Sequence, residues 1–275
     1  MEADALGRLP TPVTDIMTAA KITVDPENVL DDSFLEHMHL KASSALKRAL
    51  SKVRGLFDAR ERLVFIDQSV HKNKQTFLKL HETGHAVLPW QRNIYAVVED
   101  CDETLSPDIA DLFDREANVF ATEVLFQLDG FINEAENYPF EIKTPINLGS
   151  RYGSSVYAAI RQYVSKNHRA CVVLVLNPPE LIEGAGFRAG LRRVIPSTLF
   201  TSIFGELSWP MVFTPDDEIG AVIPPEGKKM SWPREIVLID RNGDRQECVA
   251  EAFKNSYNVF ILIHVLQIWE RTIII

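Results

Sequence analysis

Two histidines and a glutamate are the residues whose types and spacing most clearly could carry out chemistry. His81, Glu82 and His85 form the pattern His-Glu-x-x-His within "QTFLKLHETGHAVLPW", residues 75–90. On a helix, side chains four residues apart lie on one face, with Cβ atoms ~5–6 Å apart. Two imidazoles in this arrangement can bind one zinc ion, and the adjacent glutamate can take a proton from water. The pattern therefore predicts a zinc site suited to hydrolysis, with Glu82 as general base.

The segment around these residues has the pattern of a helix. Residues 74–88 are expected to be helical, and Pro89 is expected to end the helix because proline cannot continue it. The two histidines fall on the apolar face, so both side chains should point towards the core. The alternative is that they are buried histidines that only satisfy hydrogen bonds.

A catalytic zinc site takes three protein ligands, so one more must come from elsewhere. A second helix is expected after Ser106 and Pro107 and is expected to end at Gly130. Glu116 and Glu123 lie at the edge of its apolar stripe, and the residues alone do not choose between them. Asp108, Asp111 and Asp114 lie off the stripe and are expected to face solvent. The stripe itself comprises Ile109, Leu112, Phe113, Ala117, Phe120, Ala121, Val124 and Leu128.

Composition excludes several classes of protein. The chain has 275 residues, 46% of them hydrophobic, and a net charge of -9, which gives no general basic field for nucleic acid. Three widely spaced cysteines favour a reducing compartment over a disulfide framework. The N-terminus lacks the pattern of a signal peptide, and the most apolar run, residues 259–269, is shorter than the ~20 residues of a membrane span. We expect a cytoplasmic protein that does not enter a membrane.

The order of helix and strand patterns predicts an α+β fold in three parts. Residues 1–140 should form a mainly helical domain with a small sheet, including a helix at 28–53 and a strand at 62–67. Residues 136–155 should be rich in loops, and the rest of the part at 141–176 should begin as a helix and end in a buried strand at 171–176. Residues 177–275 should form a mixed α/β domain, with strands at 209–214 and 219–224. A hairpin is expected at 234–251 around "RNGD".

At this point the paired signatures resemble a known family. "KQTFLKLHETGHAVL" and "DREANVFATEVLF" are similar to the two motifs of the ImmA/IrrE-like metallopeptidases, and the likeness extends over about residues 10–165. The resemblance implies a zincin-like domain with Zn²⁺ bound by His81, His85 and Glu116, and with Glu82 as the catalytic residue. It thereby favours Glu116 over Glu123.

The family also suggests a partner. Its members are commonly regulatory proteases that cut a helix-turn-helix repressor, and several carry a similar segment of their own. Residues 146–170 resemble that segment and include four basic side chains. We give packing and substrate docking more weight than DNA binding, because the chain is acidic. Two other functions stay open: regulation by binding without proteolysis, and direct regulation of transcription on DNA. The basic residues are Arg151, Arg161, Lys166 and Arg169.

Supporting roles are open to several residues. The oxyanion of the reaction needs a hydrogen-bond donor, and His71, Arg92 and Tyr95 are candidates that spacing does not separate. The acidic cluster at residues 98–103 could orient the histidines or could be a solvated loop. Arg188, Arg192 and Arg193 could form a docking or sensing surface for a partner, or a solvated basic face.

Overall fold

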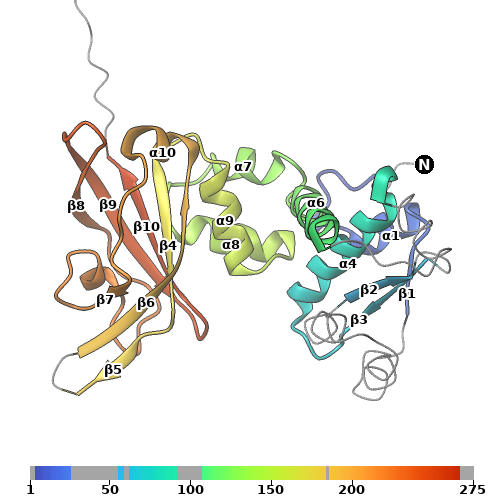
Figure 1. Ribbon diagram of the computed structural model, residues 1–275, viewed down its shortest axis with the longest axis horizontal. Coiled ribbons are helices and arrows are strands. Elements are labelled where there is room, and N and C mark those ends of the chain that lie inside the picture. The colour runs from blue at the N-terminus through green and yellow to red at the C-terminus, as the bar shows by residue number, and fades with distance from the viewer. Residues whose placement is uncertain (1–3, 26–54, 59–61, 92–106, 184–185, 267–275) are drawn as a thin grey trace, which may run out of the picture. The chain divides into compact units, whose positions relative to one another are not determined.

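The computed structural model describes residues 4–25, 55–58, 62–91, 107–183 and 186–266. The chain divides into two compact units, shown in Figure 1. Unit 1 comprises Met1–Phe131 and Gly149–Ser155, and unit 2 comprises Ile132–Leu148 and Val156–Ile275. The expected helix at 28–53, the acidic cluster at 98–103 and the candidates Arg92 and Tyr95 lie outside the described residues.

Unit 1 contains a small sheet of three short strands, β1 (Thr23–Val24), β2 (Gly55–Asp58) and β3 (Leu63–Ile66). The order is β1-β3-β2, with β1 parallel to β3 and β2 antiparallel to it. Strand β3 lies within the residues predicted as a strand, and it buries Val64 and Ile66 on one face. A short helix, α1 (Val13–Ala19), precedes β1. The small sheet expected in the N-terminal part is thus present.

Two longer helices pack against each other in unit 1. Helix α4 (Lys72–Val87) also contacts β2 and β3, and its cap residue Leu88 turns to an extended conformation before Pro89. Helix α6 (Pro107–Leu125) buries a face that runs along one side of the helix. Both helices were predicted from their apolar spacing. The buried residues of α6 are Phe113, Ala117, Ala121 and Leu125.

The predicted end and stripe of α6 need correction. The helix ends at Leu125 because Gln127 and Leu128 adopt positive φ angles of 53° and 59°, which an α-helix does not contain. Gly130 therefore does not end α6 but begins α7 (Gly130–Ala135). Ile109 and Leu112, which were expected on the buried stripe, are 40% and 49% exposed.

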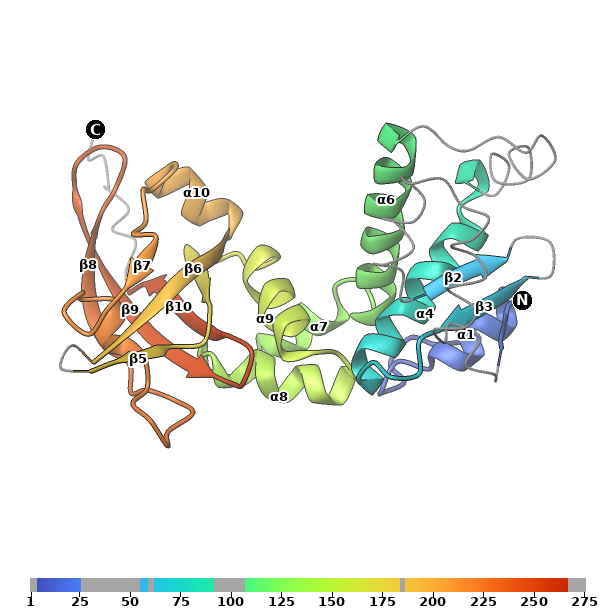
Figure 2. The same cartoon turned by 60° about the horizontal axis from the view of Figure 1, so that its bottom comes forward.

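Unit 2 is built on a curved seven-stranded sheet in which every strand pair is antiparallel (Figure 2). The order is β5-β6-β4-β10-β9-β8, with β7 added beside β6. Strand β4 lies between β6 and β10, and all six of its residues are buried, as the unbroken apolar run predicted. The strands are β4 (Cys171–Leu176), β5 (Glu180–Ile182), β6 (Gly186–Pro196), β7 (Val212–Phe213), β8 (Arg234–Ile239), β9 (Arg245–Lys254) and β10 (Val259–Val265).

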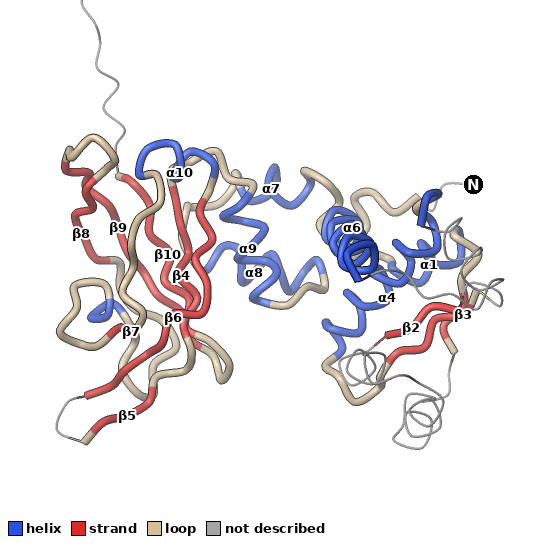
Figure 3. Tube along the Cα trace, viewed as in Figure 1, coloured by secondary structure: helices blue, strands red, loops and turns tan. Residues whose placement is uncertain are grey.

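The fold is α+β, but the C-terminal part is an antiparallel sheet rather than the mixed α/β domain predicted. Figure 3 shows strands dominating this part of the chain. The hairpin predicted around "RNGD" is β8–β9, where Gly243 adopts a φ of 88° in the turn. Residues 219–224 do not form the expected strand, because Gly220–Val222 make a 3-10 turn (η1). The strand predicted at 209–214 is present as β7.

Short helices flank the sheet of unit 2. Helix α9 (Val156–Ser165) packs against β4 and β6, and α10 (Thr198–Phe204) packs against β4. Helix α8 (Lys143–Tyr152) precedes α9, so the prediction of a loop-rich stretch at residues 136–155 is wrong for these ten residues. Gly153 adopts a φ of 75° in the turn between the two helices. Across the described residues, no helix has both the length and the apolar character to cross a membrane.

The three arginines of the predicted docking surface bond within the chain. Arg188 donates from Nε to Glu180 at 2.8 Å, and Arg192 donates to Oδ1 of Asn258 at 2.6 Å. Arg193 donates to the hydroxyl of Tyr157 at 2.9 Å. Each guanidinium of these three β6 residues therefore has a partner outside β6: on β5, directly before β10, and on α9.

Candidate metal centre

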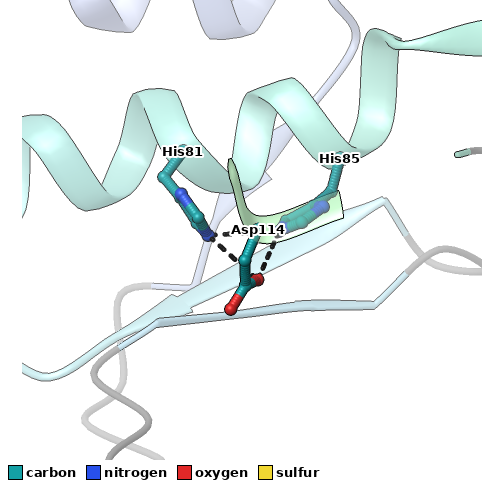
Figure 4. Close-up of side chains that lie close together, drawn as sticks. All are labelled: His81, His85 and Asp114. Carbon is teal, nitrogen blue, oxygen red and sulfur yellow. Dashed lines mark hydrogen bonds and ion pairs between the residues drawn. The ribbon is translucent and has the colours of Figure 1, made fainter. Parts of the chain in front are cut away.

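His81 and His85 lie one turn apart on α4 and point towards the same place (Figure 4). Their Nε2 atoms are 3.1 Å apart. The Oδ1 atom of Asp114, from α6, lies 3.8 Å from Nε2 of His81 and 3.6 Å from Nε2 of His85. Within the described parts of the chain, these three residues form a group whose ligand atoms lie close enough to hold a metal ion. Asp114 is exposed to solvent as predicted, but the sequence did not predict that its carboxylate also lies beside the histidines.

The spacing of these atoms fits one small cation. Two nitrogen ligands at about 2.0–2.1 Å from a tetrahedral zinc ion lie roughly 3.3 Å apart. The observed 3.1 Å between the imidazoles is close to that value, and the carboxylate oxygen is within half an ångström of it. The side chain of Asp114 is 67% exposed, so water and larger molecules can reach this side of the site. The donor set therefore has the chemistry and the spacing of an accessible divalent metal site.

A glycine between the histidines brings the two helices together. A Cβ atom added at Gly84 would lie 3.2 Å from the Cα atom of Ala117 and 3.2 Å from Cδ1 of Phe120. Such distances are shorter than ordinary van der Waals contacts, so the helices approach closely only because residue 84 has no side chain. Asp114 lies about one helical turn before Ala117, and this contact therefore brings its carboxylate near the histidines.

Burial keeps both histidines neutral. Burial and, to a smaller extent, the neighbouring ring of His85 together lower the pKa of His81 to about 4, against opposing effects of Asp114 and Asn118. Burial also lowers the pKa of His85, while Gln91 and Asp114 act in the opposite direction. Both residues are therefore uncharged at neutral pH, and the position of the remaining proton decides which ring nitrogen has the lone pair that can bind a metal.

Glu82 is a buried carboxyl group beside the site. Its side chain is almost inaccessible, and this burial raises its pKa to about 8, with a second contribution from the negative charge of Asp114. A carboxylate with a raised pKa holds a proton more strongly, and a nearby cation would favour its charged form. Glu82 therefore has the position and the raised pKa of a residue that can accept a proton close to the two imidazoles.

Comparison with known families agrees with this centre. The family model of peptidase M78, described as the IrrE N-terminal-like domain, matches residues 39–162. Those residues are therefore similar to the IrrE N-terminal-like domain. The match spans α4 and α6 and includes the two histidines, Glu82 and Asp114. No curated protein matches the chain.

A solved structure shares the overall fold. It is described as a Mycobacterium tuberculosis transcriptional regulator, and it is 12% identical to this chain with a TM-score of 0.51. The alignment covers 96% of this chain and 71% of that one. The similarity therefore extends beyond the IrrE-like domain to a helical N-terminal region followed by an antiparallel sheet.

Glu116, which the family resemblance makes the third ligand, has other partners in this structure. Its Oε2 atom accepts hydrogen bonds from Nε1 of Trp90 at 2.6 Å and from Nε2 of Gln91 at 2.7 Å. These two bonds lower the pKa of Glu116, Trp90 most and Gln91 next. Glu116 is not in the group formed by the histidines and Asp114. Its role as a metal ligand stays a prediction.

Among the oxyanion candidates, His71 is the one that the structure describes, and it lies away from the centre. His71 lies at the start of α4, where its Nδ1 accepts the backbone N–H of Asn73. Its side chain is at the opposite end of the helix from His85. Sequence reasoning did not find Gln91, a buried residue that contacts His85 directly. The only signal in the sequence was a polar side chain directly after the end of the histidine helix.

Proposed function

We propose that this protein is a zinc-dependent endopeptidase that cleaves a regulatory protein. The observation that carries the proposal is the geometry of the centre: two neutral imidazoles 3.1 Å apart, with a carboxylate and a buried glutamate beside them. The peptidase family to which the IrrE-like domain belongs supports a proteolytic use of this chemistry. His81 and His85 would hold the metal, and Glu82 would be the catalytic base.

A carboxylate from α6 would complete the metal site. The family resemblance implies Glu116 for this role, whereas the described geometry favours Asp114. Asp114 lies beside the histidines, and Oε2 of Glu116 already accepts hydrogen bonds from Trp90 and Gln91. A zinc ion held by these residues supplies Lewis-acid chemistry, polarising the scissile carbonyl and lowering the pKa of water.

The protein's own residues then supply the proton transfers. Glu82 accepts a proton on its carboxylate as water attacks the peptide carbonyl, and it later delivers that proton to the nitrogen of the leaving amine. Its burial keeps bulk water from competing for the proton. The exposed position of Asp114 leaves the side where a peptide must enter open to solvent.

We further propose a helix-turn-helix repressor as the substrate. The family resemblance motivates this choice, because ImmA/IrrE-like peptidases commonly cut such a repressor. The helix-turn-helix resemblance falls on α8 and α9. Half of the residues of α9 are buried in unit 2, which supports a packing and docking role over insertion into DNA.

We also propose that the chain comprises three functional parts. These are a peptidase domain (1–140), a helix-turn-helix-like segment (141–176) and a C-terminal domain (177–275).

The direct test compares wild type with Glu82→Gln. Each purified protein is added, with and without a chelator, to a lysate of the cells that make it, and new protein N-termini are identified by mass spectrometry. We expect wild type to create new termini, at least one of them within a helix-turn-helix protein. Glu82→Gln should reduce their rate of appearance by roughly 10²–10⁴-fold, because it removes the general base.

The same experiment separates the rival functions. Both variants should bind zinc equally, so a loss of cleavage in Glu82→Gln reports the base and not the metal. If wild type and Glu82→Gln produce the same termini, or neither produces any, the proteolytic function is wrong. Regulation by binding alone would then account better for the IrrE-like domain.

A further inference from the structure

Gln91 is a fully buried amide that connects the metal centre to α6. Its Oε1 atom lies 2.7 Å from Nδ1 of His85. Its Nε2 atom lies 2.7 Å from Oε2 of Glu116 and 3.2 Å from the backbone carbonyl oxygen of Phe113. All of these atoms belong to unit 1, so one side chain contacts a predicted metal ligand and two acceptors on the neighbouring helix.

The partners of Gln91 determine which way its amide points. A backbone carbonyl oxygen can only accept a hydrogen bond, and an ionised carboxylate likewise. The amide nitrogen must therefore face Glu116 and Phe113, because the amide oxygen would meet two other acceptors there. This leaves the oxygen facing His85. Glu116 is held in place by a second donor, the indole of Trp90.

The orientation of the amide in turn determines where His85 carries its proton. An oxygen 2.7 Å from Nδ1 can only accept, so Nδ1 must be the protonated nitrogen. In a neutral imidazole the lone pair is then on Nε2, the atom that faces His81 and Asp114. His85 is thus preset as a metal ligand before any ion arrives.

His81 has no equivalent arrangement. Among the described residues, its Nδ1 atom is buried without a hydrogen-bond partner. The side chain of Asn118 is close enough to raise the pKa of the ring. The 3.1 Å contact between the two Nε2 atoms then requires His81 to donate from Nε2 to the lone pair of His85. His81 must give up this proton when it binds a metal.

We propose that Gln91 is a positioning residue for the metal centre: Glu116 orients its amide, and the amide holds His85 with the proton on Nδ1 and the ligating lone pair on Nε2. This inference deepens the proposed function and rests on it. It gives Glu116 a task that differs from direct metal binding. Groups that fix the tautomer of a ligating histidine typically contribute 10–100-fold to metal affinity.

The test uses a substitution that keeps size and removes the hydrogen bonds. Gln91→Met should let His85 lose its single tautomer. Gln91→Glu should keep it, because a protonated carboxyl group can donate to Glu116 from its O–H and still accept from Nδ1 with its carbonyl oxygen. Long-range ¹H–¹⁵N NMR on chelator-treated protein identifies the protonated ring nitrogen. Competition with a chromophoric chelator then measures zinc affinity. Gln162→Met is the matched control, because Gln162 is also buried but lies on α9 of unit 2.

We expect wild type, Gln91→Glu and Gln162→Met to show His85 protonated at Nδ1. Gln91→Met should show protonation at Nε2 or a mixture, with zinc affinity lowered about 10–100-fold. Protonation at Nε2 in the wild type would overturn the inference, as would wild-type affinity in Gln91→Met. Because the tautomer is read without metal, these failures differ from failure of the proposed function, which absence of zinc binding by the wild type would show.

Discussion

At the scale of single residues, the centre depends on ionisable groups that burial has moved away from their ordinary behaviour. Burial lowers the pKa of both histidines and raises the pKa of Glu82 to about 8. The sequence was enough to predict these three, because the spacing of the pattern alone places two imidazoles on one face of a helix. It could not predict Asp114 as part of the centre. Asp114 is as exposed as an ordinary surface acid, and only its distance to the histidines makes it a candidate ligand.

The third ligand is testable at this scale. Asp114→Asn should lower zinc affinity about 100-fold or more, because it removes a charged donor from the site. Asp111→Asn, an exposed acid one turn earlier on α6, should stay within about twofold of the wild type. Glu116→Gln should lose less affinity than Asp114→Asn, since an amide oxygen can still accept from Trp90 and Gln91. Chelator competition measures all three, and a larger loss in Glu116→Gln would restore Glu116 as the ligand.

At the scale of elements, the centre depends on how closely α4 and α6 approach. The sequence predicted both helices from their apolar spacing and Pro89 as the limit of the first. Periodicity does not reveal which turns of two helices will touch, and that depends here on the contact of Gly84 with Ala117. The predicted end of α6 was wrong for a related reason. Gly130 is a common type of helix terminus, but positive φ angles at Gln127 and Leu128 end the helix earlier.

Gly84→Ala tests the helix contact. Alanine favours a helix by about 1 kcal/mol over glycine, but the added Cβ would meet a backbone atom at 3.2 Å, and overpacking of this kind costs ~1–3 kcal/mol. We expect the variant to be less stable than wild type by about 1 kcal/mol. Zinc affinity should fall by more than this loss of stability alone would cause, because α6 moves away from the histidines. Chemical denaturation and chelator competition measure the two effects. A variant that is more stable than wild type and binds zinc equally well would show that the helix contact can accommodate a methyl group.

At the scale of the whole molecule, the chain contains two units whose sequences differ in how readily they predict structure. The IrrE-like centre is formed by local motifs. In unit 2, the sequence predicted β4 and the β8–β9 hairpin, both of which are local, but not the strand order. Placing β4 between β6 and β10 requires pairings between residues far apart in the chain, and no short pattern encodes those.

Unit 2 should show its own dependence on pH through Glu251 of β9. This buried side chain accepts a hydrogen bond from the backbone N–H of Ile142 at 2.8 Å. Burial raises its pKa to about 7, and the charge of Glu141 adds to this effect. The folded state therefore binds more protons than the unfolded state between pH ~4.5 and ~7, so this group's contribution to stability falls as pH rises through that range.

Glu251→Gln should remove this dependence, because an amide oxygen still accepts from Ile142 but carries no charge. At pH 8 we expect the variant to be more stable than wild type by roughly 1–3 kcal/mol, with little difference at pH 4.5. Hydrogen exchange of the β4 and β9 amides reports unit 2 separately. Glu247→Gln, an exposed residue on the same strand, is the control and should show no such effect. An equal pH dependence in wild type and Glu251→Gln would contradict the assignment.

The account depends most on whether His81 and His85 hold a metal ion, and the metal content of the purified protein measures this directly. Elemental analysis after equilibration with zinc and removal of free ion should find about one zinc per chain in wild type and in Glu82→Gln. His85→Ala should retain almost none while keeping its fold by circular dichroism. Wild-type protein without zinc, or His85→Ala with the same content as wild type, would contradict the central claim.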